Sequence, residues 1–350
     1  MKRWLVYLLV AVMVFSLFAC SSSKNNSVEA PVAEETEETI ENESNNENTE
    51  ETIDEEAITL NVYMLAGPTG IGAANMIANS ENGEYSQDYT FTIATAPDEV
   101  VGKIVKGEAD IAAIPTNLAS TLYAKTNGEI TVLGVNTLGV LSLLETEQKL
   151  NTIQDIKGRT IYSTGSGSNP QYILEYVLRE NGIDPEKDVT IIYKTENTEL
   201  ATVFNEDPDA VIMAPQPVAT SIVLNSNAVV SLDMTEEWEK VASDSVLMMG
   251  CAVVRNEILE SNPKAVEQFM ADYAESITAA NEDAATTGQY CEDYGIVAKA
   301  ALATKAIPAC NLVWITGDEM RTGLEGYLTV LFNANPDSIG GKLPDESFYF

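Results

Sequence analysis

The stretch ITVLGVNTLGVLSLL, residues 130–144, decides the fold, because it is an apolar run too long for one small strand. A second run of this kind, SVLMMGCAVV, occupies residues 245–254. The sequence between the two runs has its own alternation of strand and helix patterns. Each run is long enough to pass from one lobe of a protein into another. Two lobes joined by two crossing segments form a hinge, and hinges close around ligands.

The chain from residue 58 onward alternates patterns typical of strands with patterns typical of helices. ITLNVYML and YTFTIATA alternate apolar with polar side chains, whereas residues 169–182 have helical spacing and end at an Asn-Gly pair. Such alternation predicts an α/β fold with largely parallel sheets. We expect lobe 1 to comprise residues 58–140 and 246–350, and lobe 2 to comprise residues 141–245.

The first residues of the chain have the pattern of an export signal. Two basic residues precede the apolar run WLVYLLVAVMVFSLF, and LFAC at residues 17–20 ends it. This end resembles a bacterial lipobox, with small Ala19 before Cys20, although Phe18 is bulkier than usual. The resemblance implies removal of a signal peptide, residues 1–19, and attachment of a lipid to Cys20. An ordinary secretory signal and an N-terminal membrane anchor are the alternatives.

The stretch from Cys20 to residue 57 has the composition of a tether. It is rich in glutamate, contains one lysine and has few apolar side chains. Such a composition cannot offset its ordering entropy, so we expect disorder, extended by repulsion between like charges. With the lipid on Cys20, the folded part would be held on the extracytoplasmic face of the cell membrane.

The charge balance of the chain excludes several classes of function. Its 350 residues include 19 basic and 54 acidic side chains and no histidine. A nucleic acid is excluded as a partner, because binding a phosphate backbone requires a basic surface. The missing histidine removes Ser-His-Asp and Cys-His catalysis and imidazole metal ligands. We expect no catalytic residue, no metal and no cofactor; an enzyme would depend on carboxylate, Lys, Tyr or Cys chemistry.

Three cysteines follow the tether, where disulfides persist once a chain is exported. Cys251, Cys291 and Cys310 allow one bridge and one leftover thiol. We interpret Cys251 and Cys310 as the pair. Three buried free thiols are the alternative.

Four motifs, together with the lipobox and the acidic tether, resemble the substrate-binding proteins of ABC importers. The closest group is the one for nitrate, taurine, alkanesulfonates and thiamine precursors. The motifs are GEADIAAIPTNLAS, TIQDIKGRTIYSTGSGSNP, YVLRENGIDPEKDVTIIY and DAVIMAPQPVAT. The resemblance implies a two-lobe periplasmic-binding-protein fold of the second type. It also implies capture of a small solute between the lobes and delivery to a permease with its ATPase. A ligand-sensing lipoprotein without a transport role, and an enzyme on the same scaffold, are the alternatives. We expect a monomer.

Ligands of open α/β sheets bind outside the carboxyl ends of the strands. Four uncharged turns are predicted there, at residues 67–70, 115–117, 163–169 and 214–217. They offer hydroxyls, amides and helix N-termini with unpaired N–H donors. Ordinary capping and turn roles are the alternative for each residue. The expected ligand contacts are Pro68, Thr69, Gly70, Thr116, Asn117, Thr137, Thr164, Ser166, Gly167, Ser168, Asn169 and Gln216.

These side chains leave the ligand open. A sulfonate, nitrate or carboxylate would sit on the helix N-termini, whereas a neutral or cationic heterocycle would add an aromatic stack. Tyr162, Tyr193 and Trp238 are the candidates for that stack, with positions in the core as the alternative.

Overall fold

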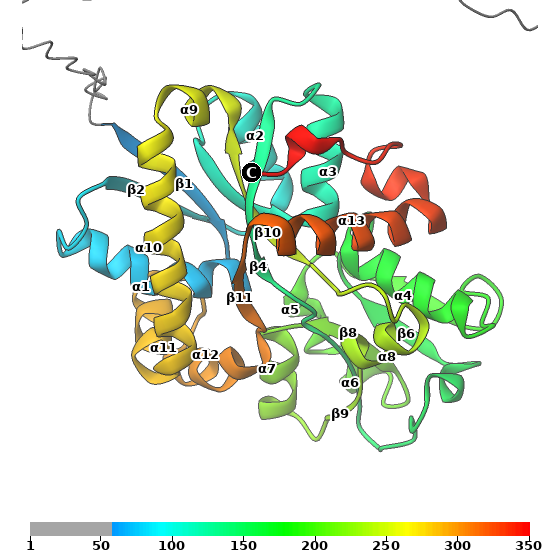
Figure 1. Ribbon diagram of the computed structural model, residues 1–350. Helices are drawn as coiled ribbons and strands as arrows, with labels where there is room; N and C mark the ends of the chain where they lie inside the picture. Colours follow the sequence, from blue (N-terminus) through cyan, green and yellow to red (C-terminus); the bar gives the residue numbers. More distant parts are fainter. Residues whose placement is uncertain (1–57) are drawn as a thin grey trace, which may run out of the picture. The chain divides into compact units, whose positions relative to one another are not determined.

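The computed structural model describes residues 58–350 (Figure 1). The predicted signal peptide, the lipid site at Cys20 and the acidic tether lie outside the described residues. Within residues 58–350, no helix is both long and apolar enough to cross a membrane.

The first sheet has six strands in the order β11-β4-β10-β3-β1-β2. Strand β1 pairs in parallel with β2 and β3, while β10 runs antiparallel between β3 and β4. The strands span β1 Thr59–Leu65, β2 Asp88–Ala94, β3 Ile111–Pro115, β4 Ile130–Thr137, β10 Gly250–Arg255 and β11 Leu312–Ile315.

The second sheet has five strands in the order β7-β6-β8-β5-β9. Strand β6 pairs in parallel with β7 and β8, and β5 runs antiparallel between β8 and β9. The α/β class is confirmed, but each sheet is mixed. Strand β5 runs antiparallel to both its neighbours in the second sheet, as β10 does in the first, where β11 also pairs antiparallel with β4. The strands span β5 Leu141–Glu145, β6 Thr160–Ser163, β7 Thr190–Tyr193, β8 Val211–Pro215 and β9 Val229–Asp233.

The chain passes between the sheets twice. Residues 138–140 join β4 to β5, and residues 242–249 join α8 (Met234–Val241) to β10. The apolar run 130–144 therefore forms one strand in each sheet, which confirms the two crossing segments. Strand β4 is buried at every position, because it lies between β11 and β10 in the first sheet and is covered on both faces.

Helices follow most strands and cover the sheets (Figure 1). Proline stands in the first turn of α1, α2, α4 and α10, where its missing N–H costs no helical hydrogen bond. The first sheet carries α1 Pro68–Glu81, α2 Pro97–Val105, α3 Thr116–Lys125, α9 Asn256–Ser261, α10 Pro263–Glu282, α11 Ala284–Asp293 and α12 Ala300–Ala306. The second carries α4 Asn169–Glu180, α5 Asn197–Leu200, α6 Val203–Glu206, α7 Val218–Asn225 and α8. Short 3-10 helices span Ile153–Ile156, Ile307–Ala309, Pro336–Ile339 and Glu346–Phe348.

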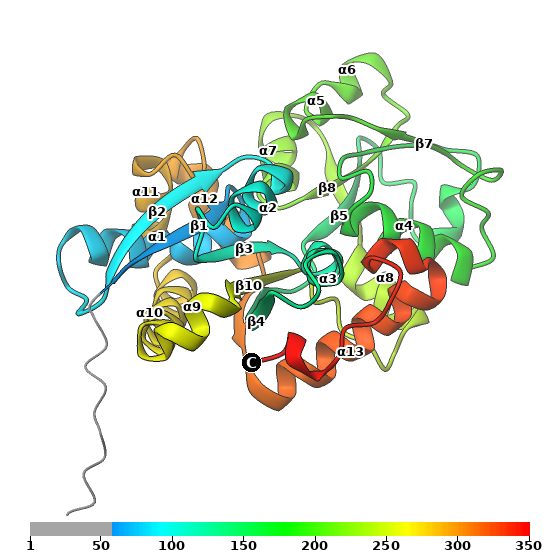
Figure 2. The same cartoon turned by 90° about the horizontal axis from the view of Figure 1, so that it is seen from above.

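The last long helix, α13 (Gly317–Ala334), connects the two halves of the fold. Figure 2 shows it beside α4 and α8, and the ring of its Tyr327 lies 5.6 Å from that of Trp238. The chain after α13 returns to the first sheet, where the N–H of Phe350 donates to the carbonyl of Val132 at 3.0 Å. One buried apolar cluster therefore continues through both halves.

The expected Cys251–Cys310 disulfide is not formed: Cys251, Cys291 and Cys310 are buried free thiols. Cys251 packs in the apolar cluster on one face of the first sheet, and Cys310 packs in the cluster on the other. Alternation along β10 points the Cys251 side chain away from Cys310. Burial raises the pKa of Cys291 and of Cys310 to about 12, so both thiols stay protonated at neutral pH.

Candidate functional site

The four predicted turns all lie between the carboxyl end of a strand and the amino end of a helix. Residues 67–70 lead from β1 into α1 and residues 115–117 from β3 into α3, in the first half of the fold. Residues 163–169 lead from β6 into α4 and residues 214–217 from β8 into α7, in the second. Helix N-termini present N–H groups without helical partners, so all four turns can offer donors to a bound group.

Three of the predicted residues meet at the second crossing segment. The N–H of Thr116 donates to the carbonyl of Met249 at 3.1 Å, and its hydroxyl donates to that of Met248 at 2.5 Å. The N–H of Met249 donates to the carbonyl of Thr137 at 3.0 Å. The side-chain amide of Asn169 donates to the carbonyl of Met249 at 2.9 Å. The structure thus joins turns from both halves of the fold through the backbone of residues 248–249.

The side chain of Asn169 is used at both ends. Its Oδ1 accepts a hydrogen bond from the Tyr327 hydroxyl at 3.1 Å, in addition to the bond that its Nδ2 donates to Met249. Asn169 is 1% exposed and Tyr327 is fully buried. The amide therefore ties the start of α4 to α13 and to the crossing segment.

The middle of the turn before α4 is open to solvent, whereas Ser163 and Thr164 at its start are buried. Ser166 and Gly167 are exposed, and Ser168, the residue that precedes α4, makes no side-chain cap. The hydroxyl of Ser166 lies 3.4 Å from Oε1 of Gln171, which also accepts from the N–H of Gly167 at 2.8 Å. Nearby, the Thr164 hydroxyl donates to Oδ1 of Asn197 at 2.7 Å.

The turn before α1 is more tightly packed. Pro68 is half-buried, and the hydroxyl of Thr69 donates to the carbonyl of Leu65 at 3.0 Å. A Cβ on Gly70 would lie 2.7 Å from that same carbonyl and 2.9 Å from the side chain of Ile296. Glycine is therefore required at position 70, because the backbone carbonyl of Leu65 and the loop between α11 and α12 leave no room for a Cβ.

The turn before α7 is held by the first crossing segment. The N–H of Gln216 donates to the carbonyl of Val140 at 3.0 Å, and its Oε1 accepts from the Thr220 hydroxyl at 2.7 Å. In the turn before α3, the side-chain amide of Asn117 donates to the carbonyl of Ser338 at 3.1 Å. Within the described residues, Oδ1 of Asn117 is buried without a hydrogen-bond partner.

The three predicted aromatic residues lie in different surroundings. Trp238 is fully buried between the rings of Tyr176 and Tyr327, so it has the core role. Tyr162 lies under the ammonium group of Lys194, which is 5.6 Å from its ring centroid. Tyr193 pairs with Ser163, beside the start of the turn before α4, and it lines a pocket.

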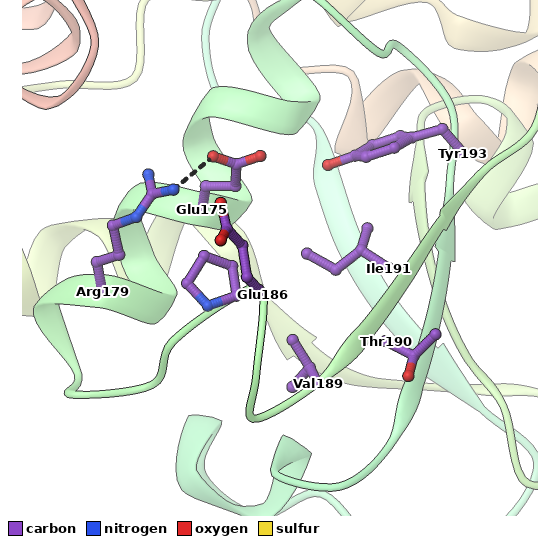
Figure 3. Close-up of a pocket in the computed structure, with 8 residues that line it drawn as sticks. Glu175, Arg179, Glu186, Val189, Thr190, Ile191 and Tyr193 are labelled. Carbon is purple, nitrogen blue, oxygen red and sulfur yellow. Dashed lines mark hydrogen bonds and ion pairs between the residues drawn. The ribbon is translucent and has the colours of Figure 1, made fainter.

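This pocket, about 410 Å³ in volume, lies between α4 and β7 (Figure 3). Sequence reasoning singled out only Tyr193 among its residues, because the pocket depends on β7 being the last strand of its sheet. Its walls are Glu175, Arg179, Pro185, Glu186, Val189, Thr190, Ile191 and Tyr193. Within residues 58–350, no group of three His, Cys, Asp or Glu side chains is placed to hold a metal ion.

Comparisons with known proteins find a matching family and similar structures. A family model described as NMT1/THI5 like matches residues 91–286. An ABC transporter protein from Parabacteroides distasonis has a similar structure, with TM-score 0.69, 21% identity and coverage of 83% of this chain and 98% of that one. No curated protein matches by sequence.

Two sulfonate-binding proteins are also similar in structure. The periplasmic aliphatic sulphonate binding protein SsuA from Escherichia coli has TM-score 0.66 and 13% identity, covering 83% of this chain and 92% of that one. The alkanesulfonate-binding protein SsuA from Xanthomonas axonopodis pv. citri, bound to MOPS, has TM-score 0.63 and 14% identity, covering 84% and 97%. These similarities confirm the periplasmic-binding-protein fold.

Proposed function

The chain belongs to the NMT1/THI5-like family, and we propose that it is the extracytoplasmic solute-binding lipoprotein of an ABC importer. The observation that carries this proposal is the arrangement of two sheets, two crossing segments and four turns that end in helix N-termini. The match to the family model includes three of these turns, at residues 115–117, 163–169 and 214–217.

We propose that residues 58–140 and 246–350 form lobe 1 and residues 141–245 form lobe 2. The hydrogen bonds that Thr116, Thr137 and Asn169 make to the second crossing segment support a hinge at that point, because they couple it to turns of both halves. A solute bound between the lobes would then influence how far they open.

The turn before α4 is the proposed centre of the solute site. Ser166 and Gly167 are exposed, and the bond between the Ser166 hydroxyl and Gln171 is long at 3.4 Å, so this hydroxyl is available to a ligand. The buried amide of Asn169 fixes the end of this turn through its bonds to Met249 and Tyr327. An uncharged turn at a helix N-terminus suits the oxygens of a small organic or anionic solute. Two similar structures are of sulfonate-binding proteins, so sulfonates are the first solutes to test.

The remaining parts of the proposal concern the cell. Removal of residues 1–19 and lipidation of Cys20 would anchor the protein to the membrane, with residues 20–57 as its tether. The partners are the permease and its ATPase, and the protein acts as a monomer. We propose binding without catalysis: the solute leaves the protein chemically unchanged.

Thermal unfolding of the purified protein with a panel of sulfonates, nitrate, pyrimidines, flavins and amino acids tests the proposal. A solute at 100 times its Kd should stabilise the protein by about 2.7 kcal/mol. Mass spectrometry of the recovered solute then separates binding from turnover. If none of these solutes shifts the unfolding temperature, the importer function loses its support.

Substitution Ser166→Ala locates the site. Loss of one hydrogen bond of about 1.5 kcal/mol should raise the Kd for the solute about tenfold. The matched control is Ser261→Ala, the same change at an exposed position on α9, which should leave the Kd unaltered. Equal affinities of the two variants would remove the turn before α4 from the site.

A further inference from the structure

Strand β7 forms one edge of the second sheet. It pairs with β6, and no strand in the described part of the chain pairs with its other side. The backbone N–H groups of Thr190 and Lys194 donate to carbonyls on the β6 side, at 3.0 and 2.7 Å. Because the direction of these groups alternates along a strand, the N–H and carbonyl groups of Ile191 and Tyr193 point outward. These outward groups can pair with a further strand.

A groove runs along this edge. The 410 Å³ pocket is bounded by Ile191 on β7, by Val189 just before β7, and by Glu175 and Arg179 on α4 (Figure 3). Val189 and Ile191 supply apolar surface beside the outward backbone groups. A strand added along β7 would direct every second side chain toward α4 and into this groove.

The hydroxyl of Tyr193 lies buried in the groove without a hydrogen-bond partner among the described residues. Figure 3 shows the Tyr193 side chain extending toward α4. Burial raises the pKa of this hydroxyl, so it stays protonated and can both donate and accept. A buried polar group without a partner costs free energy, which a ligand recovers by supplying one.

The charge of the groove is negative. The carboxylate of Glu175 is paired with Arg179 at 3.0 Å, so these two charges offset each other. The exposed carboxylate of Glu186 makes no ion pair within the described residues. A cationic side chain would therefore be attracted to the groove, whereas the glutamate-rich tether of this chain would be repelled.

We propose that the groove between α4 and β7 is a second binding site, which takes an extended basic peptide segment of a partner protein as an added strand. The backbone of the peptide pairs with the outward groups of Ile191 and Tyr193. A lysine or arginine side chain lies with its stem on Val189 and Ile191 and its charge near Glu186. This mode of recognition obtains affinity from main-chain hydrogen bonds and specificity from pockets for alternate side chains. None of the expected solute contacts lines this groove, although it borders the turn before α4, where Tyr193 pairs with Ser163.

Hydrogen exchange of the full chain, resolved to single amides, tests this site with the peptide acetyl-TKVKVT-amide. The amides of Thr190 and Ile192 should be protected with or without peptide, because they bond to β6. The amides of Ile191 and Tyr193 should exchange at least about tenfold more slowly once the basic peptide binds. The acidic counterpart, acetyl-TEVEVT-amide, should give no such protection.

Two conservative substitutions separate the parts of the site. Tyr193→Phe removes only the buried hydroxyl and should raise the Kd for the basic peptide about tenfold, while Tyr290→Phe, on α11, should not change it. Glu186→Gln should weaken the basic peptide by a factor of about 3 to 10, whereas Glu239→Gln, an exposed change on α8, should have no effect.

Four results would overturn the proposal. They are no protection at Ile191 and Tyr193 with the basic peptide, and equal protection with the acidic one. A third is binding of free propylamine in the groove with the same affinity as the peptide, which would identify a small-amine pocket. The fourth is protection of these amides that grows with protein concentration alone, which would identify a second copy of the chain as the occupant.

Discussion

Replacement of Asn169 by alanine tests whether this residue holds the fold or contacts the solute. Its amide donates to the carbonyl of Met249 at 2.9 Å and accepts from the hydroxyl of Tyr327 at 3.1 Å. Asn169→Ala removes both bonds, each contributing about 1 kcal/mol, and leaves the Tyr327 hydroxyl without that partner in the core. The carbonyl of Met249 keeps the bond from Thr116. We expect the free energy of unfolding to fall by about 2–4 kcal/mol.

Tyr327→Phe removes one of the two bonds and keeps the ring in place. It should lower the free energy of unfolding by about 1–2 kcal/mol, because Oδ1 of Asn169 is then buried without that donor. The double variant should lose less than the sum of the two single changes, by about 1 kcal/mol, since the shared bond can be lost only once.

Urea unfolding of the four proteins in this cycle gives the free energies directly, and solute titration of the same samples gives the Kd. Asn205→Ala, the same change at an exposed position of α6, is the matched control and should stay within about 0.5 kcal/mol of the parent. The reasoning is refuted if Asn169→Ala unfolds at the same urea concentration as the parent but no longer binds solute. Asn169 would then be a ligand contact rather than a link between α4 and α13.

Three further predictions concern packing, thiols and acid stability. Gly134→Ala should destabilise the fold by about 1–3 kcal/mol, because the new Cβ would lie 2.7 Å from the ring of Trp314. Gly102→Ala in α2, where a new Cβ would meet no atom within 4 Å, should stabilise the fold by about 0.5–1 kcal/mol. Thermal unfolding of both variants measures the two effects. The three buried cysteines should resist alkylation in the native protein and all react in denaturant, and an alkylation-resistant pair in denaturant without reductant would reveal a disulfide. The pKa of Asp155 is lowered by hydrogen bonds from the backbone N–H groups of Asn151 and Thr152, so the stability that this carboxylate contributes is present at neutral pH and is lost as the pH falls through its folded-state pKa. The difference in unfolding free energy between the parent and Asp155→Asn should therefore shrink toward acid. A difference that stays constant with pH would contradict this assignment.

The local elements of the fold could be predicted because their signals lie within short windows. Residues 169–182 have helical spacing, and α4 spans Asn169–Glu180. The run 130–144 continues beyond the length of one strand, and it does form β4 and β5 in different sheets. The spacing and the length of apolar runs in the sequence show which face of a helix or strand is buried, and residues close together in the chain make up that face.

The roles of single polar groups could not be predicted in the same way. The partners of Asn169 lie 80 and 158 residues away in the chain, so nothing near Asn169 indicates that both ends of its amide are used. The expected disulfide was wrong for a related reason. Apolar surroundings indicate that Cys251 and Cys310 are buried, but not that they belong to clusters on opposite faces of a sheet.

For the groove along β7, too, one part could be predicted from the sequence and another could not. The sequence alone determines that VTIIYK is a strand and that a helix precedes it, because apolar periodicity and turn residues are local properties. Only the tertiary structure decides that β7 is the last strand of its sheet, with the hydroxyl of Tyr193 buried beside α4. Strand order results from the packing of segments distant in sequence, and that packing decides which hydrogen-bonding groups the protein satisfies itself and which remain available to a partner.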